Sequence, residues 1–163
     1  MKPISAKLVE QTWKRQAQLT PSKIQTVVRD FSESQPMILA YLMAMSDSLL
    51  NESESELLLY LGTTVWQMME AGAHNIELVT ETTLEEIEDK NMKMLEYLEG
   101  ESEDDFIQTV EKIIEGYNQK EVLRYVVEAL FESDEDDGQG EIRDEMIGQI
   151  FIFLKVIIDC LDQ

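Results

Sequence analysis

The stretch MIGQIFIFLKVIIDCL, residues 146–161, decides the fold of this chain. Its apolar residues leave no broad polar face, and the polar ones are Gln149, Lys155 and Asp159. A bilayer-spanning helix needs about 20 largely apolar residues, so this segment is too short and too charged to be one. A helix without a polar face must be covered on several sides. We therefore predict a buried helix at the centre of an all-α fold.

Two other segments, 36–50 and 51–72, are also apolar nearly all round, and we expect them to share the centre with 146–161. The remaining predicted helices have one apolar stripe each, at the spacing i, i+3, i+4, i+7. A chain of 163 residues is long enough to bury a substantial core as one unit. We predict a single all-helical domain over 1–163, a compact bundle of roughly seven to eight helices.

Local signals place the helix ends. Proline after a capping position predicts starts at Pro21 and Pro36, and Gly72, Gly100 and Gly116 predict ends. Three pairs resemble capping boxes or their acidic variant, and a lone asparagine is a fourth cap candidate: Asn51 with Glu54, Thr83 with Glu86, Ser102 with Asp105, and Asn118. Residues 73–82 leave room for a short extended piece.

Charge is the most informative feature for function. The first 31 residues, a predicted basic helical segment, carry 6 basic and 2 acidic residues, or +4, and the other 132 carry 7 basic and 32 acidic, or −25. From Phe31 to Asp89 there are 12 carboxylates and no lysine or arginine, so the usual i, i+4 pairing with lysine is missing. Such a surface repels phosphates and attracts cationic partners.

We therefore predict a non-enzymatic protein-interaction module, such as an adaptor, a regulator or a chaperone-like protein, that presents an acidic surface to a basic protein. The plainer alternative is a surface that only keeps the protein soluble. Direct binding of nucleic acid is disfavoured, although a DNA-mimic inhibitor stays open. The candidate partner-binding carboxylates come from two clusters: Glu52, Glu54, Glu56, Glu85, Glu86, Glu88 and Asp89.

The residues that most catalytic and metal sites need are scarce. Cys160 is the sole cysteine and His74 the sole histidine, so a structural zinc site cannot be built from this chain. The sequence contains no glycine-rich phosphate loop, and its carboxylate clusters fit the first turns of helices. We predict no catalytic residues and no cofactor, while an enzyme without a readable signature stays open. Cys160 is expected to be a buried thiol.

The calcium alternative rests on the segment 134–145. Its Asp-Gly-Gln-Gly-Glu-Ile core resembles an EF-hand loop, but with Gly140 as the turn glycine position 12 is Met146, and with Glu145 at position 12 the turn position is Gln139. We predict an acidic, flexible loop at 133–140. The ligands of the calcium alternative would be Asp134, Asp136, Asp137, Glu141 and Glu145.

The cellular setting follows from two expectations. Residues 1–10 lack the apolar run of a secretory signal, which favours the cytoplasm. No segment has the length and apolarity of a membrane span, so no membrane partner is expected. The sequence leaves formation of a homo-oligomer open.

Overall fold

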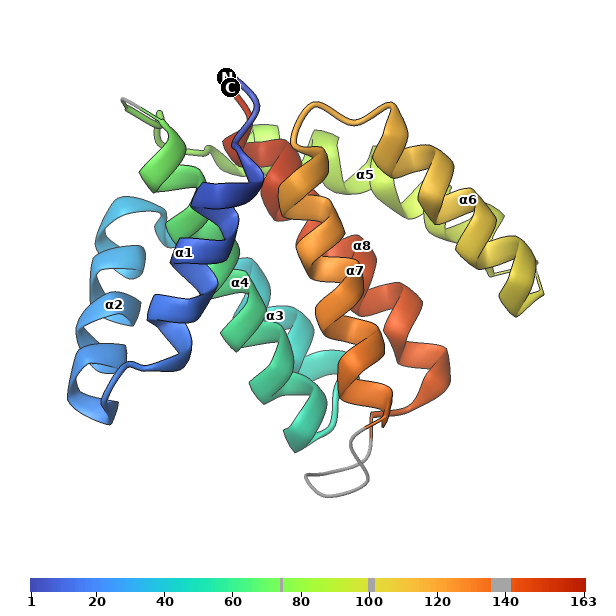
Figure 1. The fold of residues 1–163 in the computed structure, drawn as a ribbon, viewed down its shortest axis with the longest axis horizontal. Coiled ribbons are helices and arrows are strands. Elements are labelled where there is room, and N and C mark those ends of the chain that lie inside the picture. Colours follow the sequence, from blue (N-terminus) through green and yellow to red (C-terminus); the bar gives the residue numbers. More distant parts are fainter. Residues whose placement is uncertain (74, 100–101, 136–141) are drawn as a thin grey trace.

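A computed structural model describes residues 1–73, 75–99, 102–135 and 142–163. It confirms the predicted all-α bundle, with eight helices among these residues and no strand among them (Figure 1). The helices are α1 (Ala6–Ala17), α2 (Pro21–Ser34), α3 (Pro36–Leu49), α4 (Glu52–Gly72), α5 (Glu81–Leu98), α6 (Glu103–Glu115), α7 (Lys120–Glu135) and α8 (Asp144–Leu161).

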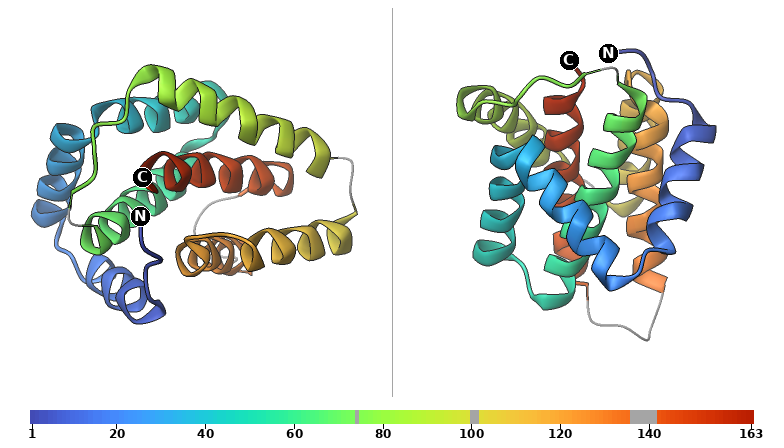
Figure 2. Two further views of the ribbon diagram at one scale, coloured as in Figure 1. Left: turned by 90° about the horizontal axis from the view of Figure 1, so that it is seen from above. Right: turned by 90° about the vertical axis from the view of Figure 1, so that its left-hand side faces the viewer.

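The predicted central helix is α8, in which 12 of 18 residues are buried. Helices α4, α5 and α7 pack around it, and the view from above shows α8 between α5 on one side and α6 and α7 on the other (Figure 2). Helix α4 buries 10 of its 21 residues and completes the core. None of the helices in the described residues is long and apolar enough to cross a membrane.

Helix α3 does not share the centre as predicted. It buries only Ile38, Tyr41, Leu42 and Ser46, while Met43 is 53% exposed and Leu49 47% exposed. Helix α3 lies between α2 and α4 at the side of the bundle, and α5 takes the place beside α8 that we expected for α3. An apolar helix can therefore leave large side chains partly in solvent when the core is already filled.

The helix ends follow the sequence signals with three exceptions. Both hydrogen bonds of the Asn51–Glu54 capping box form, and the Ser102 hydroxyl accepts from the Asp105 amide. Helix α5, however, begins at Glu81 because Thr80 is its cap and accepts from the Thr83 amide, so the predicted start at Thr83 is wrong. The stretch before it contains no extended strand among its described residues.

The other two exceptions lie at α7. Helix α7 begins at Lys120 with the Gln119 carbonyl accepting from Leu123, so Asn118 is not its cap. The helix continues to Glu135, and the predicted loop 133–140 is wrong for residues 133–135. The rest of that loop lies outside the described residues.

The basic N-terminal segment forms α1 and α2, which pack against the side of the bundle. Helix α1 lies on α4 and α7, and α2 lies on α3 and α4. All six basic side chains of residues 1–31 are exposed, and two of them form ion pairs with carboxylates on their own helices: Lys14 with Glu10, and Arg29 with Asp30 and Glu33. We call α1 and α2 the basic flank.

Candidate functional site

More than half of the exposed carboxylates in the described residues lie on α5, α6 and the first turn of α8. These elements are on the side of the bundle away from the basic flank (Figure 1). Among the described residues of α5 and α6 the only cations are Lys90, Lys93 and Lys112, and Lys93 already pairs with Asp89 at 2.7 Å. We call this surface the acidic end; its exposed carboxylates are Glu81, Glu85, Glu86, Asp89, Glu96, Glu99, Asp104, Asp105, Glu111, Glu115, Asp144 and Glu145.

The structure separates the predicted partner-binding residues into two groups. Glu85, Glu86 and Asp89 are exposed within one turn of α5, and Glu88 beside them is half-buried. Glu52 and Glu56 are exposed in the first turns of α4, whereas α5 follows the other end of that helix. Since α4 has 21 residues, the two groups are about 30 Å apart along its axis. They cannot form one compact site.

Glu54 does not belong to an exposed surface, and that prediction is corrected. Its side chain is fully buried, and its Oε2 accepts from Arg143 Nη2 at 2.7 Å while its Oε1 accepts from Arg143 Nε at 2.9 Å. The Oε2 atom also accepts from the Asn51 amide. These hydrogen bonds, first of all those from Arg143, lower the pKa of Glu54 to about 2. Glu54 therefore holds the start of α8 against the start of α4.

A cavity of about 590 Å³ lies between the last turns of α5 and α7, the first turn of α6 and the first two turns of α8. Its walls are mostly apolar and its acidic residues are exposed, namely Glu99, Asp144 and Glu145. The volume is within the range of about 300–1,000 Å³ that is usual for ligand pockets. The apolar wall consists of Leu95, Leu98, Phe106, Phe131 and Ile147, with Gly148 on the α8 side.

A buried polar network links α8 to α5 and to the α6–α7 connection. Lys155 Nζ donates to Asp159 Oδ2 at 2.7 Å and to Asn91 Oδ1 at 3.1 Å, and it lies 4.9 Å from the centre of the Tyr117 ring. Asn91 Nδ2 also donates to Asp159, and the Tyr117 hydroxyl donates to the other oxygen of that carboxylate. Burial and the neighbouring Asp159 raise the pKa of Tyr117. All four polar groups are satisfied by one another, which marks the network as structural.

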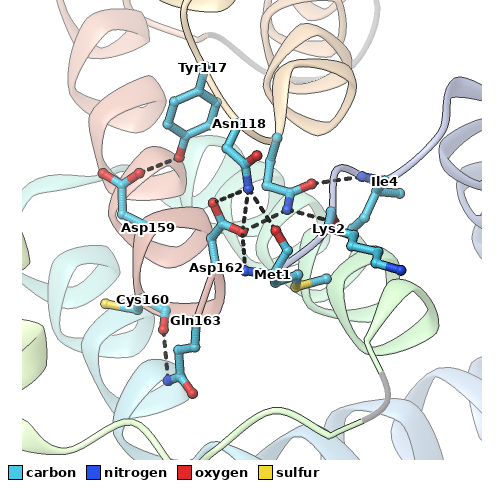
Figure 3. Close-up of polar contacts among 10 residues, drawn as sticks. Met1, Lys2, Ile4, Tyr117, Asn118, Asp159, Cys160, Asp162 and Gln163 are labelled. Carbon is cyan, nitrogen blue, oxygen red and sulfur yellow. Dashed lines mark hydrogen bonds and ion pairs between the residues drawn. The ribbon is translucent and has the colours of Figure 1, made fainter.

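Asp162 forms a second polar cluster at the end of α8 (Figure 3). Its carboxylate accepts from Gln119 Nε2 at 2.7 Å and from Asn118 Nδ2 at 2.9 Å, and it lies 3.6 Å from the Met1 nitrogen. The same two amides donate to the carbonyls of Met1 and Lys2, and Gln119 Oε1 accepts from the Ile4 amide at 2.9 Å. The side chain of Asn118 is therefore used to hold residues 1–4 against the end of α8.

Two of the five candidate calcium ligands, Asp134 and Glu145, lie in the described residues. Asp134 lies in the last turn of α7 and Glu145 is exposed in the first turn of α8, while Asp136, Asp137 and Glu141 lie outside the described residues, as does His74. Within the described ranges no three histidine, cysteine or carboxylate side chains are grouped so as to hold a metal ion. Calcium binding stays a prediction.

The thiol of Cys160 is 1% exposed, as expected, and burial raises its pKa to about 12. A thiol with so high a pKa is neutral at physiological pH and therefore a poor nucleophile. We assign Cys160 to the core.

Sequence reasoning missed both the cavity and the polar network, although each had a signal. Gly148 is a glycine inside a long apolar helix, where glycine lowers helix stability. Lys155 and Asp159 are spaced i, i+4 in the most apolar segment, which is the spacing of a helical ion pair. Comparisons with family models, with curated proteins and with solved structures found no match to this chain.

Proposed function

We propose that this protein binds a basic protein partner through its acidic end. The observation that carries the proposal is the separation of charge in space: the carboxylates of α5, α6 and early α8 lie away from the basic flank, which does not cover them. An uncovered surface of one sign attracts partners of the other sign and accelerates their encounter. A surface that served solubility alone would need no such separation.

The local geometry supports this reading. The acidic end has twelve exposed carboxylates, whereas the described parts of α5 and α6 contain three lysines, so these carboxylates outnumber the cations beside them fourfold. Exposed ion pairs contribute little to stability, and these carboxylates contribute even less where no pair exists. Their concentration is better explained by an external cation than by the stability of the fold.

The test is capture of partners from a lysate, followed by binding of each purified candidate. The immobilised protein should retain basic proteins at low salt and release them as salt rises, because screening weakens surface attraction. The double substitution Glu85→Lys and Glu86→Lys should abolish this retention. The control Asp30→Lys and Glu33→Lys makes the same change in net charge, from −21 to −17, but at exposed positions of α2 in the basic flank.

Three results would count against the proposal. Retention of nothing at low salt would refute it. Equal loss of binding in both double variants would show that total charge, and not the acidic end, attracts the partner. Binding that persists unchanged at high salt would show that the contact is not electrostatic.

A further inference from the structure

The cavity between α5, α6, α7 and α8 opens within the acidic end, so the two features form one surface. Phe106, Phe131 and Ile147 are only half-buried in its wall, although large apolar side chains are normally buried more completely. Glu99, Asp144 and Glu145 also line this cavity, and all three are exposed. An apolar recess beside anionic groups matches a ligand that carries apolar groups beside cationic ones.

Close packing of α8 against its neighbours does not require glycine at position 148. A Cβ atom built there would lie 3.7 Å from Phe106 Cε2 and 3.9 Å from Leu95 Cδ1, which are ordinary contacts. At Gly62 of α4, by contrast, a Cβ atom would lie 2.6 Å from Leu42 Cδ1, so the buried Leu42 side chain would have to shift to admit it. Glycine at 148 costs helix stability without such a reason, and its effect is to keep the cavity wide.

We propose that this cavity is the anchoring site for the apolar side chains of a basic amphipathic helix, whose cationic face lies along the acidic end. The inference rests on the proposed function and adds the form of the partner. Helix-in-groove recognition uses apolar anchors at i, i+3, i+4 and i+7, with the polar face of the helix outside the groove. The carboxylates of Glu99, Asp144 and Glu145 are placed to meet lysine or arginine flanking those anchors.

The experiment compares two labelled synthetic peptides of equal length and charge by fluorescence anisotropy. One is an amphipathic helix with leucines on one face and lysines on the other, and the second replaces the leucines by serines. Burial of one leucine is worth about 1.5–3 kcal/mol, so the amphipathic peptide should bind at least about tenfold more tightly. Both affinities should fall with salt.

Gly148→Leu is the decisive variant, because it fills the cavity without changing any charge. It should lower the affinity for the amphipathic peptide about tenfold, to that of the serine peptide, and leave binding of the serine peptide unchanged. Gly116→Leu is the matched control, because Gly116 is exposed at the end of α6 outside the cavity, and this variant should bind as the unsubstituted protein does. Phe106→Gln, on the α6 wall, should lower the affinity for the amphipathic peptide even if Gly148→Leu fails to fold.

The outcomes separate the two proposals. If neither peptide binds at low salt, the proposed function fails as well. If the serine peptide binds but Gly148→Leu and Phe106→Gln leave the preference for the amphipathic peptide intact, the cavity is not the anchoring site and the proposed function stands. If sedimentation shows a dimer that Gly148→Leu disperses, a second copy of this chain occupies the cavity and the inference is wrong.

Discussion

Glu54 differs in burial and in its partners from most of the other 33 acidic residues of the chain. It is fully buried and paired with Arg143, whereas Glu56, two residues later on the same helix, is exposed. The pair connects Glu54 in the first turn of α4 with Arg143 at the start of α8, 89 residues later in the sequence. At the scale of single residues, burial and partner decide what a carboxylate does, and sequence composition does not reveal either.

We predict that Glu54→Gln lowers the free energy of unfolding by about 1.5–3 kcal/mol at pH 7, because it removes the charge that strengthens the hydrogen bonds from Arg143. Glu56→Gln should change it by less than about 0.5 kcal/mol, as expected for a surface position. Urea denaturation followed by circular dichroism measures both. Equal effects of the two substitutions would contradict the assigned role of Glu54.

The same residue predicts a pH dependence. The pKa of Glu54 is about 2 in the folded protein against an ordinary value of 4.5, so its ionised form stabilises the fold. That contribution is complete above about pH 4.5 and is lost as pH falls toward 2. Over this window the stability of Glu54→Gln should fall less steeply than that of the unsubstituted protein. If the stabilities of the two proteins fall equally with pH, Arg143 does not lower the pKa of Glu54.

Two glycines give a matched pair of predictions. Gly148→Ala should raise the free energy of unfolding by about 0.5–1 kcal/mol, because alanine favours the helix and its Cβ meets only ordinary contacts. Gly62→Ala should lower it by about 1–3 kcal/mol, because its Cβ would lie 2.6 Å from Leu42 Cδ1 in the core. Thermal unfolding of both variants should therefore shift in opposite directions. Shifts of the same sign would mean that the two helix contacts do not differ as described.

At the scale of helices, the network of Lys155, Asp159, Asn91 and Tyr117 fixes α8 against α5 and the α6–α7 connection. Asp159→Leu should destabilise the protein by about 3 kcal/mol, because it leaves the buried Lys155 without its anion. Adding Lys155→Met should recover much of that loss, because no buried charge then remains. The exposed pair Lys93–Asp89 on α5 is the control, and its double-mutant cycle should give a much smaller coupling energy, because solvent screens both charges.

Denaturant unfolding of the single and double variants gives the coupling energy of each ion pair from its double-mutant cycle. A coupling energy for the buried pair no larger than that of the Lys93–Asp89 pair would show that Lys155 reaches solvent. In that case the network would not fix the position of α8.

The sequence allowed good prediction of features that depend on neighbouring residues. Asn51 with Glu54 and Ser102 with Asp105 cap helices because each pair spans only three residues. The start at Thr83 was wrong because Thr80 offers the same hydroxyl one turn earlier, and a pattern of spacing does not choose between them. Asn118 was misassigned because its amide is used by Asp162, 44 residues away.

Features that depend on the arrangement of helices could not be predicted. The segments 36–50 and 51–72 looked alike in apolarity, yet α4 is central and α3 is peripheral. Helix α4 packs along α8, whereas α3 meets it mainly through the ring of Tyr41, which lies edge-on against Phe153. The cavity requires four helices to diverge at one place, and no single segment encodes that. Gly148 and Lys155 are unusual residues for an apolar helix, and the sequence shows that much. It does not show which residues of other helices surround them.

At the scale of the whole molecule, a net charge of −21 works against the compact state. We predict that the urea midpoint rises as sodium chloride is added to a low-salt buffer, because screening reduces the repulsion among carboxylates. The Glu85→Lys, Glu86→Lys variant should be more stable than the parent at low salt and gain less from added salt. A midpoint that falls with salt would show that attractive ion pairs outweigh the repulsion.

The opposed positions of the basic flank and the acidic end make the folded protein a permanent electric dipole. A molecule of this kind rotates in the field of a charged neighbour before it touches that neighbour, so encounters with a cationic protein begin with α5 and α6 in front. Two copies of the chain each carry a net charge of −21 and repel one another, least strongly when the basic flank of one faces the acidic end of the other. The position of the first 31 residues in the fold therefore influences how a cationic partner is oriented on approach, as well as how strongly it is attracted.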